Sequence, residues 1–221
     1  FQPAALAEIA TRERIGHLTV VPGVIVRLIV ELRRLSAPPA RVRVVGVMPD
    51  LVPPHQLAEL TGLVGAPYGN TFGSTETGLP PASRGLIPPG VAPTRLSKQQ
   101  SSFCAVRLVD PDDHEVADGE PGEMTLRGPT LFSGYWGADA VNAEEFRGGW
   151  FHMGDVFRRN PDGTLDFVDR RKYLIKSGGE NIYPAEIERV ILAMPGVADA
   201  VVVRRADARW GEVPVAFVVR H

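Results

Sequence analysis

The sequence predicts an α/β protein built from three successive parts. Helix-like and strand-like segments alternate through residues 1–98, which favours a partial mixed-sheet α/β subdomain covered by helices. Short β-like runs separated by turn residues fill residues 99–169 and favour a small β-barrel-like subdomain. Residues 170–221 run in the order strand, glycine loop, helix and two strands, which predicts the start of a small α+β C-terminal domain.

The helices and strands of the first part each have a local reason. Pro3 suits the first turn of a helix, and apolar residues recur at helical spacing over residues 24–35. A further helix is expected over residues 55–63, after a pair of prolines. The short apolar runs at 17–21 and 41–45 predict strands between these helices.

The composition changes around residues 80–100, where Pro, Gly, Ser and Gln dominate. Such a composition predicts a long surface segment rather than a packed element. Beyond it, β-like runs separated by Asp, Pro, Asn and Gly turns predict strands at 103–109, 123–127, 155–159 and 164–168.

In residues 170–221, proline and glycine mark the expected ends of the helix. Pro184 is placed to start a helix, and Pro195-Gly196 to end it. The apolar runs at 200–204 and 213–219 then predict two strands that pair with each other.

The charge balance excludes several classes of partner. The 221 residues carry 24 Lys and Arg against 26 Asp and Glu, a net charge of −2, and the basic residues form no tract. No nucleic acid partner is therefore expected. No apolar run approaches the roughly 18 residues of a transmembrane helix, so no transmembrane segment is expected.

The cysteine count and the first residues bear on location. Cys104 is the single cysteine, which excludes a disulfide within the chain and favours a reducing, cytoplasmic location. The chain opens with Phe1 inside a helical pattern, and residues 1–18 lack the basic start and apolar run of a signal peptide. We therefore expect the sequence to be a piece of a longer protein.

The first segment with chemical character is Asn70-Thr-Phe-Gly-Ser-Thr-Glu-Thr-Gly78. Small hydroxylated residues beside glycines let backbone N–H groups and hydroxyls approach a phosphate. The carboxylate of Glu76 adds an oxygen ligand of the kind that Mg²⁺ takes together with phosphate. Alone, such a segment is more typical of a polar surface turn than of a phosphate site.

Two later segments also combine unusual residue types. Gly149-Trp-Phe-His-Met-Gly-Asp155 ends in a carboxylate that could accept hydrogen bonds from the two hydroxyls of a ribose, or could simply form an Asx turn. Residues 169–188 join a charged stretch, a double glycine and a helix started by proline. A double glycine suits a place where a backbone passes close to a ligand, although a plain loop is the alternative.

In this order and spacing, the segments resemble the motifs of acyl-CoA synthetases, in the acyl-adenylate-forming (AMP-binding) superfamily that also holds luciferases and peptide-synthetase adenylation domains. Residues 72–76 resemble its aromatic-Gly-x-Thr-Glu motif, and 122–128 with 134–136 its barrel signature. Residues 150–155 resemble the ribose-binding motif, and 169–188 the hinge and thioester loop. The resemblance runs along the whole chain and implies that residues 170–221 are a truncated lid domain.

The resemblance implies a role for each matching residue. Phe72 would stack on adenine, Thr75 would touch the α-phosphate and Glu76 would hold Mg²⁺. Asp155 would bind the ribose hydroxyls with help from Arg170. The implied nucleotide-binding set is Thr71, Phe72, Gly73, Thr75, Asp155 and Arg170.

The implied catalytic set is Thr75, Glu76, Lys172 and Lys176. Lys172 lies at the position of the family's hinge, about which the lid swings between two half-reactions. Lys176 and the CoA and thioester loop, Gly178 and Gly179, would then move to the site. Thr77 and Gly78 would line the acyl pocket.

The sequence departs from the family pattern at several positions. Met153 stands where Thr is usual, and Tyr173 where Asp is common. The Gly-Gly-Ala-Pro segment of the family would fall at residues 47–50, which do not match, so no residue is assigned there. A similar run at 68–71 is not followed by Glu, so the motif is taken to end at Glu76.

The resemblance implies an ATP-dependent acid:CoA ligase that forms an acyl-AMP and then an acyl-CoA from a small carboxylic acid, with ATP, Mg²⁺ and coenzyme A. The neutral, apolar segment Thr77-Gly-Leu-Pro-Pro81 is compatible with an aliphatic or aromatic acid but does not identify it. The alternatives are an adenylation domain that loads a carrier protein, and an adenylate-binding piece without catalysis. The family's phosphate loop and late catalytic lysine would lie outside residues 1–221, so we expect this chain by itself to be inactive. A homodimer is left open as the oligomeric state.

Overall fold

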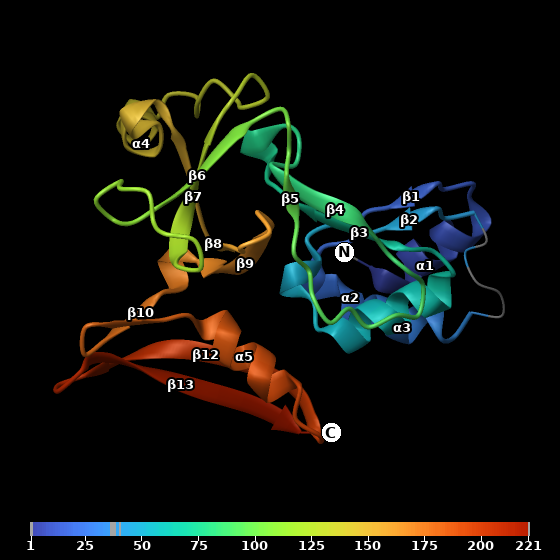
Figure 1. Ribbon diagram of the computed structural model, residues 1–221. Coiled ribbons are helices and arrows are strands. Elements are labelled where there is room, and N and C mark those ends of the chain that lie inside the picture. The colour runs from blue at the N-terminus through green and yellow to red at the C-terminus, as the bar shows by residue number, and fades with distance from the viewer. Residues whose placement is uncertain (1, 36–38, 40, 221) are drawn as a thin grey trace. The chain divides into compact units, whose positions relative to one another are not determined.

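A computed structural model describes residues 2–35, 39 and 41–220. The chain divides into two compact units, Phe1–Ser101 and Ser102–His221 (Figure 1). Each unit has its own sheets and helices.

The first unit is built on a mixed sheet of five strands in the order β1-β2-β3-β4-β5. The pairs β1–β2 and β2–β3 are parallel, and the pairs β3–β4 and β4–β5 are antiparallel. The predicted mixed-sheet subdomain is therefore confirmed. The strands are β1 (His17–Leu18), β2 (Val44–Val45), β3 (Tyr68–Phe72), β4 (Ala82–Ile87) and β5 (Gln99–Gln100).

Three helices, α1 (Pro3–Arg12), α2 (Ile25–Leu32) and α3 (Pro54–Val64), lie on one side of this sheet (Figure 1). Their apolar faces pack against the strands in one hydrophobic core, because burying both surfaces removes apolar area from water. Its side chains with no exposed surface are Ile25, Leu28, Val45, Leu57, Leu60 and Tyr68. The helix predicted over residues 24–35 is shorter and spans Ile25–Leu32, and a 3₁₀ turn at Pro22–Val24 precedes it.

The prediction of an unpacked segment over residues 80–100 is wrong in part. Strand β4 lies there and pairs with β3, with Phe72 opposite Ala82, and β5 follows at its far edge. Ser83, Arg84 and Gly85 interrupt the apolar pattern of β4, so its strand state depends on the hydrogen bonds of β3 rather than on its own residues.

The second unit begins with an antiparallel sheet of four strands in the order β6-β7-β8-β9. Within the described residues, β6 and β9 are its edges, so the predicted barrel-like part is an open sheet, since four strands are too few to close around a core. The strands are β6 (Ala105–Val109), β7 (Pro121–Arg127), β8 (Phe151–Arg159) and β9 (Leu165–Arg170).

The link between β7 and β8 holds a short helix, α4 (Asp139–Glu145), and a 3₁₀ turn, Arg147–Gly149. The sequence did not predict α4. None of its residues is buried, so it carries no apolar periodicity from which a helix could be inferred.

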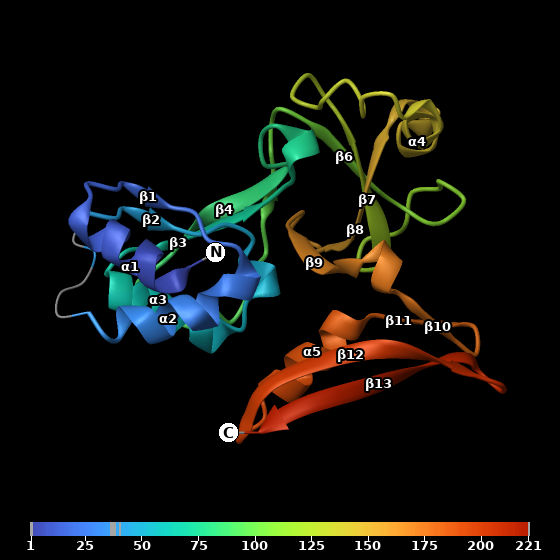
Figure 2. The same cartoon turned by 180° about the vertical axis from the view of Figure 1, so that it is seen from behind.

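The chain continues into a second four-stranded sheet, in the order β11-β10-β13-β12. Helix α5 packs along β12, as Figure 2 shows, and Val201 faces Phe217 in the predicted pairing of the last two strands. The elements are the 3₁₀ turn η5 (Arg171–Tyr173), β10 (Ile175–Ser177), β11 (Glu180–Ile182), α5 (Pro184–Leu192), β12 (Val197–Asp207) and β13 (Gly211–Arg220).

This C-terminal part packs against the antiparallel sheet before it. Asp169 at the end of β9 accepts a hydrogen bond from the backbone N–H of Ala185, in the first turn of α5, at 2.9 Å. Val156, Val168 and Tyr183 form a small apolar cluster beside this contact. The Asp169 carboxylate thus satisfies an N–H group that the helix leaves without an internal partner.

A buried ion pair links two distant segments of the first unit. The Lys98 ammonium is 2.7 Å from both carboxylate oxygens of Asp50 and donates a hydrogen bond to the Leu96 carbonyl at 2.8 Å. The side chains of Lys98 and Asp50 are 0% and 6% exposed. The pair joins the 3₁₀ turn Pro49–Leu51, which follows β2, to the residue before β5.

We predict that Lys98→Met destabilises the protein by about 3–5 kcal/mol, because it leaves the Asp50 carboxylate buried without its nearest cation. The double variant Lys98→Met, Asp50→Asn should regain much of this loss, since the charge itself is then removed. Urea unfolding measures both values. Arg12→Met, which breaks an exposed pair with Glu13, is the control and should change stability by less than about 1 kcal/mol. A loss below about 1 kcal/mol for Lys98→Met would contradict the prediction.

Candidate functional site

The predicted phosphate segment begins at the carboxyl end of β3. Thr71 is half-buried and is the second-last residue of this strand. Ligands of open α/β sheets commonly bind at the carboxyl ends of the strands. The Phe72 side chain is 2% exposed, which leaves little of its ring for an adenine. Its stacking role stays a prediction.

The turn after β3 is held by the hydroxyl of Thr77. This hydroxyl accepts a hydrogen bond from the backbone N–H of Ser74 at 3.1 Å and donates one to the Ser74 carbonyl at 2.9 Å. Thr75 is exposed and Glu76 half-exposed on the 3₁₀ turn between them. A fixed turn thus presents one hydroxyl and one carboxylate, which are hard oxygen ligands of the kind that Mg²⁺ prefers.

Thr77 and Gly78 were predicted to line an acyl pocket. The Thr77 side chain is 1% exposed and its hydroxyl is bonded within the turn, while Gly78 is exposed directly after it. Their contact with an acyl group stays a prediction.

The loop at residues 46–50, to which the sequence assigned no role, borders this segment. The Met48 backbone N–H donates a hydrogen bond to the Thr71 carbonyl at 2.9 Å, and the Tyr68 hydroxyl donates one to the Val47 carbonyl at 3.1 Å. Met48 has φ +53°, which is uncommon for a residue other than glycine. The sequence could have pointed to this loop only through an expected parallel pairing of the strands at 41–45 and 68–72. Such a pairing places the residues after the first strand beside the residues after the second.

In the second unit, Asp155 of β8 lies opposite Arg170 of β9. The Arg170 Nε atom is 3.1 Å from Asp155 Oδ1, and Asp155 is 3% exposed. None of the described residues donates a well-aligned hydrogen bond to this oxygen. A buried carboxylate oxygen in this state is suited to accept a hydrogen bond from a ligand hydroxyl.

Burial raises the pKa of Asp155 to about 6. The positive charges of Arg170 and Lys172 act in the opposite direction, and the negative charge of Glu123 adds to the rise. Asp155 is therefore mostly ionised at neutral pH and mostly protonated near pH 5.

The remaining predicted residues follow Arg170 along the chain. Lys172 lies exposed on the 3₁₀ turn η5, with its ammonium 4.9 Å from the centre of the Tyr173 ring. Lys176 is exposed on β10. Gly178 and Gly179 form the two-residue turn between β10 and β11, with φ +57° and +93°, values that such a hairpin turn requires. The turn accounts for both glycines, and their contact with CoA stays a prediction.

The predicted residues thus fall into two groups. Thr71–Gly78 belong to the first unit, and the group from Asp155 to Gly179 belongs to the second. Within the second group, the structure brings Asp155 and Arg170 into contact.

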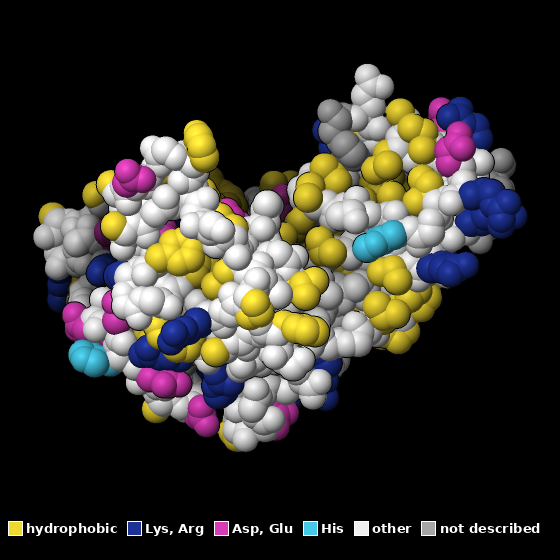
Figure 3. Space-filling model, turned by 90° about the horizontal axis from the view of Figure 1, so that it is seen from above, with side chains coloured by type: hydrophobic (Ala, Val, Ile, Leu, Met, Phe, Trp, Pro, Cys, Tyr) yellow, Lys and Arg dark blue, Asp and Glu magenta, His cyan; other side chains and the backbone are white. Residues whose placement is uncertain are grey.

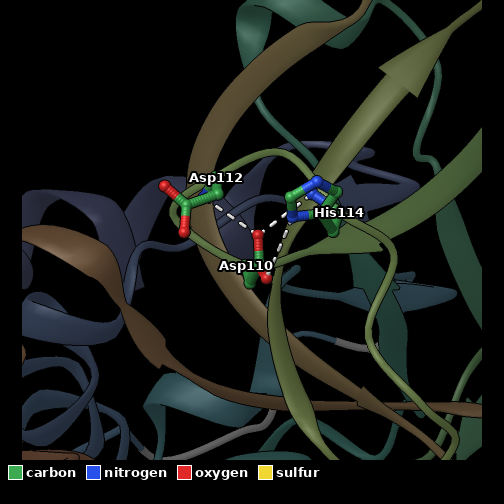
Figure 4. A group of neighbouring side chains, drawn as sticks. All are labelled: Asp110, Asp112 and His114. Atoms are coloured by element: carbon green, nitrogen blue, oxygen red, sulfur yellow. Dashed lines mark hydrogen bonds and ion pairs between the residues drawn. The ribbon is translucent and has the colours of Figure 1, made fainter.

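Asp110, Asp112 and His114 come together in the turn after β6 (Figure 4). Asp110 Oδ1 accepts hydrogen bonds from the backbone N–H groups of Asp112 and His114, at 2.9 and 3.0 Å. These are the bonds of an Asx turn, and they account for the arrangement.

The surface agrees with the charge balance of the sequence. On the face drawn in Figure 3, Lys and Arg side chains stand in separate groups, some of them with acidic side chains beside them. Within the described residues, no helix has the length and apolar character that crossing a membrane requires.

Comparison with protein families finds two matches. Residues 1–136 match the family described as AMP-binding enzyme, and residues 186–221 match the AMP-binding enzyme C-terminal domain. The first match covers more than half of the chain.

Two similar proteins are acid:CoA ligases. An indoleacetate–CoA ligase from Aromatoleum aromaticum is 35% identical over 99% of this chain and 42% of its own length. A 2-succinylbenzoate–CoA ligase from Geobacillus kaustophilus is 36% identical over 99% of this chain and 44% of its own length. The chain thus spans less than half the length of these relatives.

Solved structures resemble the chain over its whole length. An o-succinylbenzoate CoA synthetase from Bacillus subtilis, in complex with its acyl-adenylate intermediate, has a TM-score of 0.75 at 29% identity, covering 100% of this chain and 44% of that one. An amide bond synthetase from Marinactinospora thermotolerans has a TM-score of 0.78 at 28% identity, covering 100% of this chain and 46% of that one. With its motifs, its mixed sheet and these matches, the chain belongs to the AMP-binding enzyme family.

Proposed function

We propose that the protein containing this chain is an ATP-dependent acid:CoA ligase that forms an acyl-AMP and then an acyl-CoA. The observation that carries the proposal is the buried Asp155 oxygen beside Arg170, which is suited to accept a ribose hydroxyl. The named relatives support the choice of CoA as acceptor, since they are CoA ligases or a CoA synthetase.

Three residues of the chain have different roles in the proposed first step. Asp155 accepts hydrogen bonds from the ribose and so orients the nucleotide, and the Thr75 hydroxyl donates a hydrogen bond to the α-phosphate. Glu76 holds Mg²⁺, which when bound offsets the negative charge that the phosphates and the acid bring together. Positioned charges of this kind supply most of the stabilisation in such a transfer.

The second step requires the C-terminal part to move. Lys172, on the exposed turn between the two sheets of the second unit, is the proposed hinge. Lys176 and the Gly178-Gly179 turn follow it and would meet CoA in the second arrangement. Residues at the ends of elements commonly absorb the dihedral changes of such a motion.

The substrate class is proposed from the relatives. Indoleacetate and 2-succinylbenzoate, in the names of the two ligases, are aromatic carboxylic acids, and a feruloyl-CoA synthase from Amycolatopsis is 49% identical over 54% of this chain. We therefore propose an aromatic carboxylic acid as the substrate and the cytoplasm as the location, the latter on the single cysteine.

A second candidate is an enzyme that transfers the acyl group to an amine. The resemblance to an amide bond synthetase favours it, because adenylation would be shared and only the acceptor would differ. Measuring product formation from an aromatic acid and ATP, with CoA or with an amine, tests the two proposals against each other.

Glu76→Gln in the complete protein should reduce Mg²⁺-dependent acyl-AMP formation by about 100-fold, because a charged metal ligand is lost. ATP–pyrophosphate exchange over a Mg²⁺ titration measures the effect. Glu120→Gln, which changes an exposed carboxylate in the turn before β7, is the control. Unchanged exchange at all Mg²⁺ concentrations would show that Glu76 holds no metal.

Asp155→Asn should raise the KM for ATP by about 10- to 100-fold at pH 7.5, the cost of a lost charge-assisted hydrogen bond. In the unaltered protein, the KM for ATP should rise as the pH falls through about 6, because Asp155 takes up a proton and loses its charge. The variant should lack this dependence. The same pH profile in both proteins would refute the ribose role.

Lys172→Pro should separate the two half-reactions, because proline fixes φ near −65° and blocks the rotation that a hinge must make. Acyl-AMP formation should be largely retained while acyl-CoA formation falls steeply. Lys172→Ala, which keeps backbone freedom, is the control, and single-turnover measurements resolve the two steps. Equal losses in both steps would indicate a structural role for Lys172.

A further inference from the structure

Glu123 of β7 is a buried carboxylate to which the sequence assigned no role. Its side chain is 6% exposed. Arg171 donates a hydrogen bond from Nη1 to Glu123 Oε2 at 2.9 Å, and the Gly154 backbone N–H donates one to Oε1 at 3.1 Å. The His152 ring and the Arg147 guanidinium approach Oε2 at 3.4 and 3.7 Å. These contacts compensate a charge that would otherwise be costly to bury.

The hydrogen bonds from Arg171 and Gly154 lie next to the proposed ribose site. Gly154 directly precedes Asp155, and Arg171 directly follows Arg170. One oxygen of Glu123 thus binds Gly154, the residue before Asp155. The other oxygen binds Arg171, the residue after Arg170.

The pairing of β7 with β8 is irregular beside Glu123. Glu123 faces Val156 and Thr125 faces His152, so two steps along β7 face four steps along β8. Strand β8 therefore bulges over Met153, Gly154 and Asp155, and Gly154 has φ +74°. Bulges of this kind re-aim side chains next to active sites.

Glu123 Oε1 accepts a hydrogen bond from the backbone N–H of Gly154, at the centre of the bulge. The Arg171 contact fixes the chain at the end of β9, so Arg170 keeps its place opposite the bulge. We infer that Glu123 is a positioning residue for nucleotide binding: it holds the bulge that aims Asp155 and fixes the segment that carries Arg170. The inference rests on the proposed function, since it concerns the same ribose site.

The test compares Glu123→Ala and Glu123→Gln in the complete protein, using ATP and 2′,3′-dideoxy-ATP in pyrophosphate exchange. Glu123→Ala should raise the KM for ATP by up to about 100-fold, the effect of a misplaced contact. It should also reduce the preference for ATP over the dideoxy nucleotide, while the KM for the acid stays unchanged. Glu123→Gln should have a smaller effect, because its amide oxygen can still accept the Gly154 hydrogen bond.

Glu115→Gln is the matched control, since Glu115 has a side chain that is 61% exposed and lies 3.9 Å from Arg107. It should change neither KM nor the nucleotide preference. AMP binding by calorimetry, on protein whose folded fraction is known from urea unfolding, supplies a readout that does not need turnover.

The outcomes separate the inference from the proposed function. If Asp155→Asn removes the preference for ATP but folded Glu123→Ala keeps it, Glu123 is structural and the inference is overturned alone. If Asp155→Asn keeps the preference, the ribose site itself is overturned, and the inference with it. Should Glu123→Ala fail to fold, Glu123→Gln decides: a preference equal to that of the unaltered protein overturns the inference, and a reduced one supports it.

Discussion

Each buried charge in this chain must be compensated inside the protein, and that constraint organises both units. In the first unit, Lys98 and Asp50 tie the turn after β2 to the start of β5, the edge strand that pairs with β4. In the second, Glu123 joins the bulge of β8 to the end of β9. Because a carboxylate removed from water is stable only with close cations or N–H donors, these pairs decide which loops can lie together.

The carboxylates differ in how many hydrogen bonds they accept, and this difference bears on the proposed ribose-binding role of Asp155. Asp169 accepts hydrogen bonds on both oxygens, from the backbone N–H groups of Arg170 and Ala185. Asp155 lies near Arg170 but lacks an aligned donor on Oδ1, and burial raises its pKa. A site that binds a hydroxyl needs an acceptor oxygen that is not already hydrogen-bonded within the protein. Such an oxygen lowers the folding stability of the ligand-free protein.

The packing of the C-terminal part has a consequence for the proposed two-step reaction. Helix α5 contacts the preceding sheet through the Asp169 carboxylate, the Arg158–Glu186 ion pair at 3.4 Å and a small apolar cluster around Tyr183. Such a small, partly polar contact is what a part that changes place requires, because a large apolar interface would hold one arrangement too strongly. The exposed turn that contains Lys172 lies between these two attached parts.

The sequence by itself determined the mixed α/β class, the core helices with their apolar faces, the final strand pair and the motifs that name the family. These depend on local periodicity, on proline and glycine, and on short segments whose order is specific. Only the tertiary structure decided that residues 82–87 form a strand, that Lys98 is buried, and that Glu123 supports the neighbours of Asp155 and Arg170. Those features arise between segments far apart in the chain, where hydrogen bonds and charge compensation override the preferences of single residues.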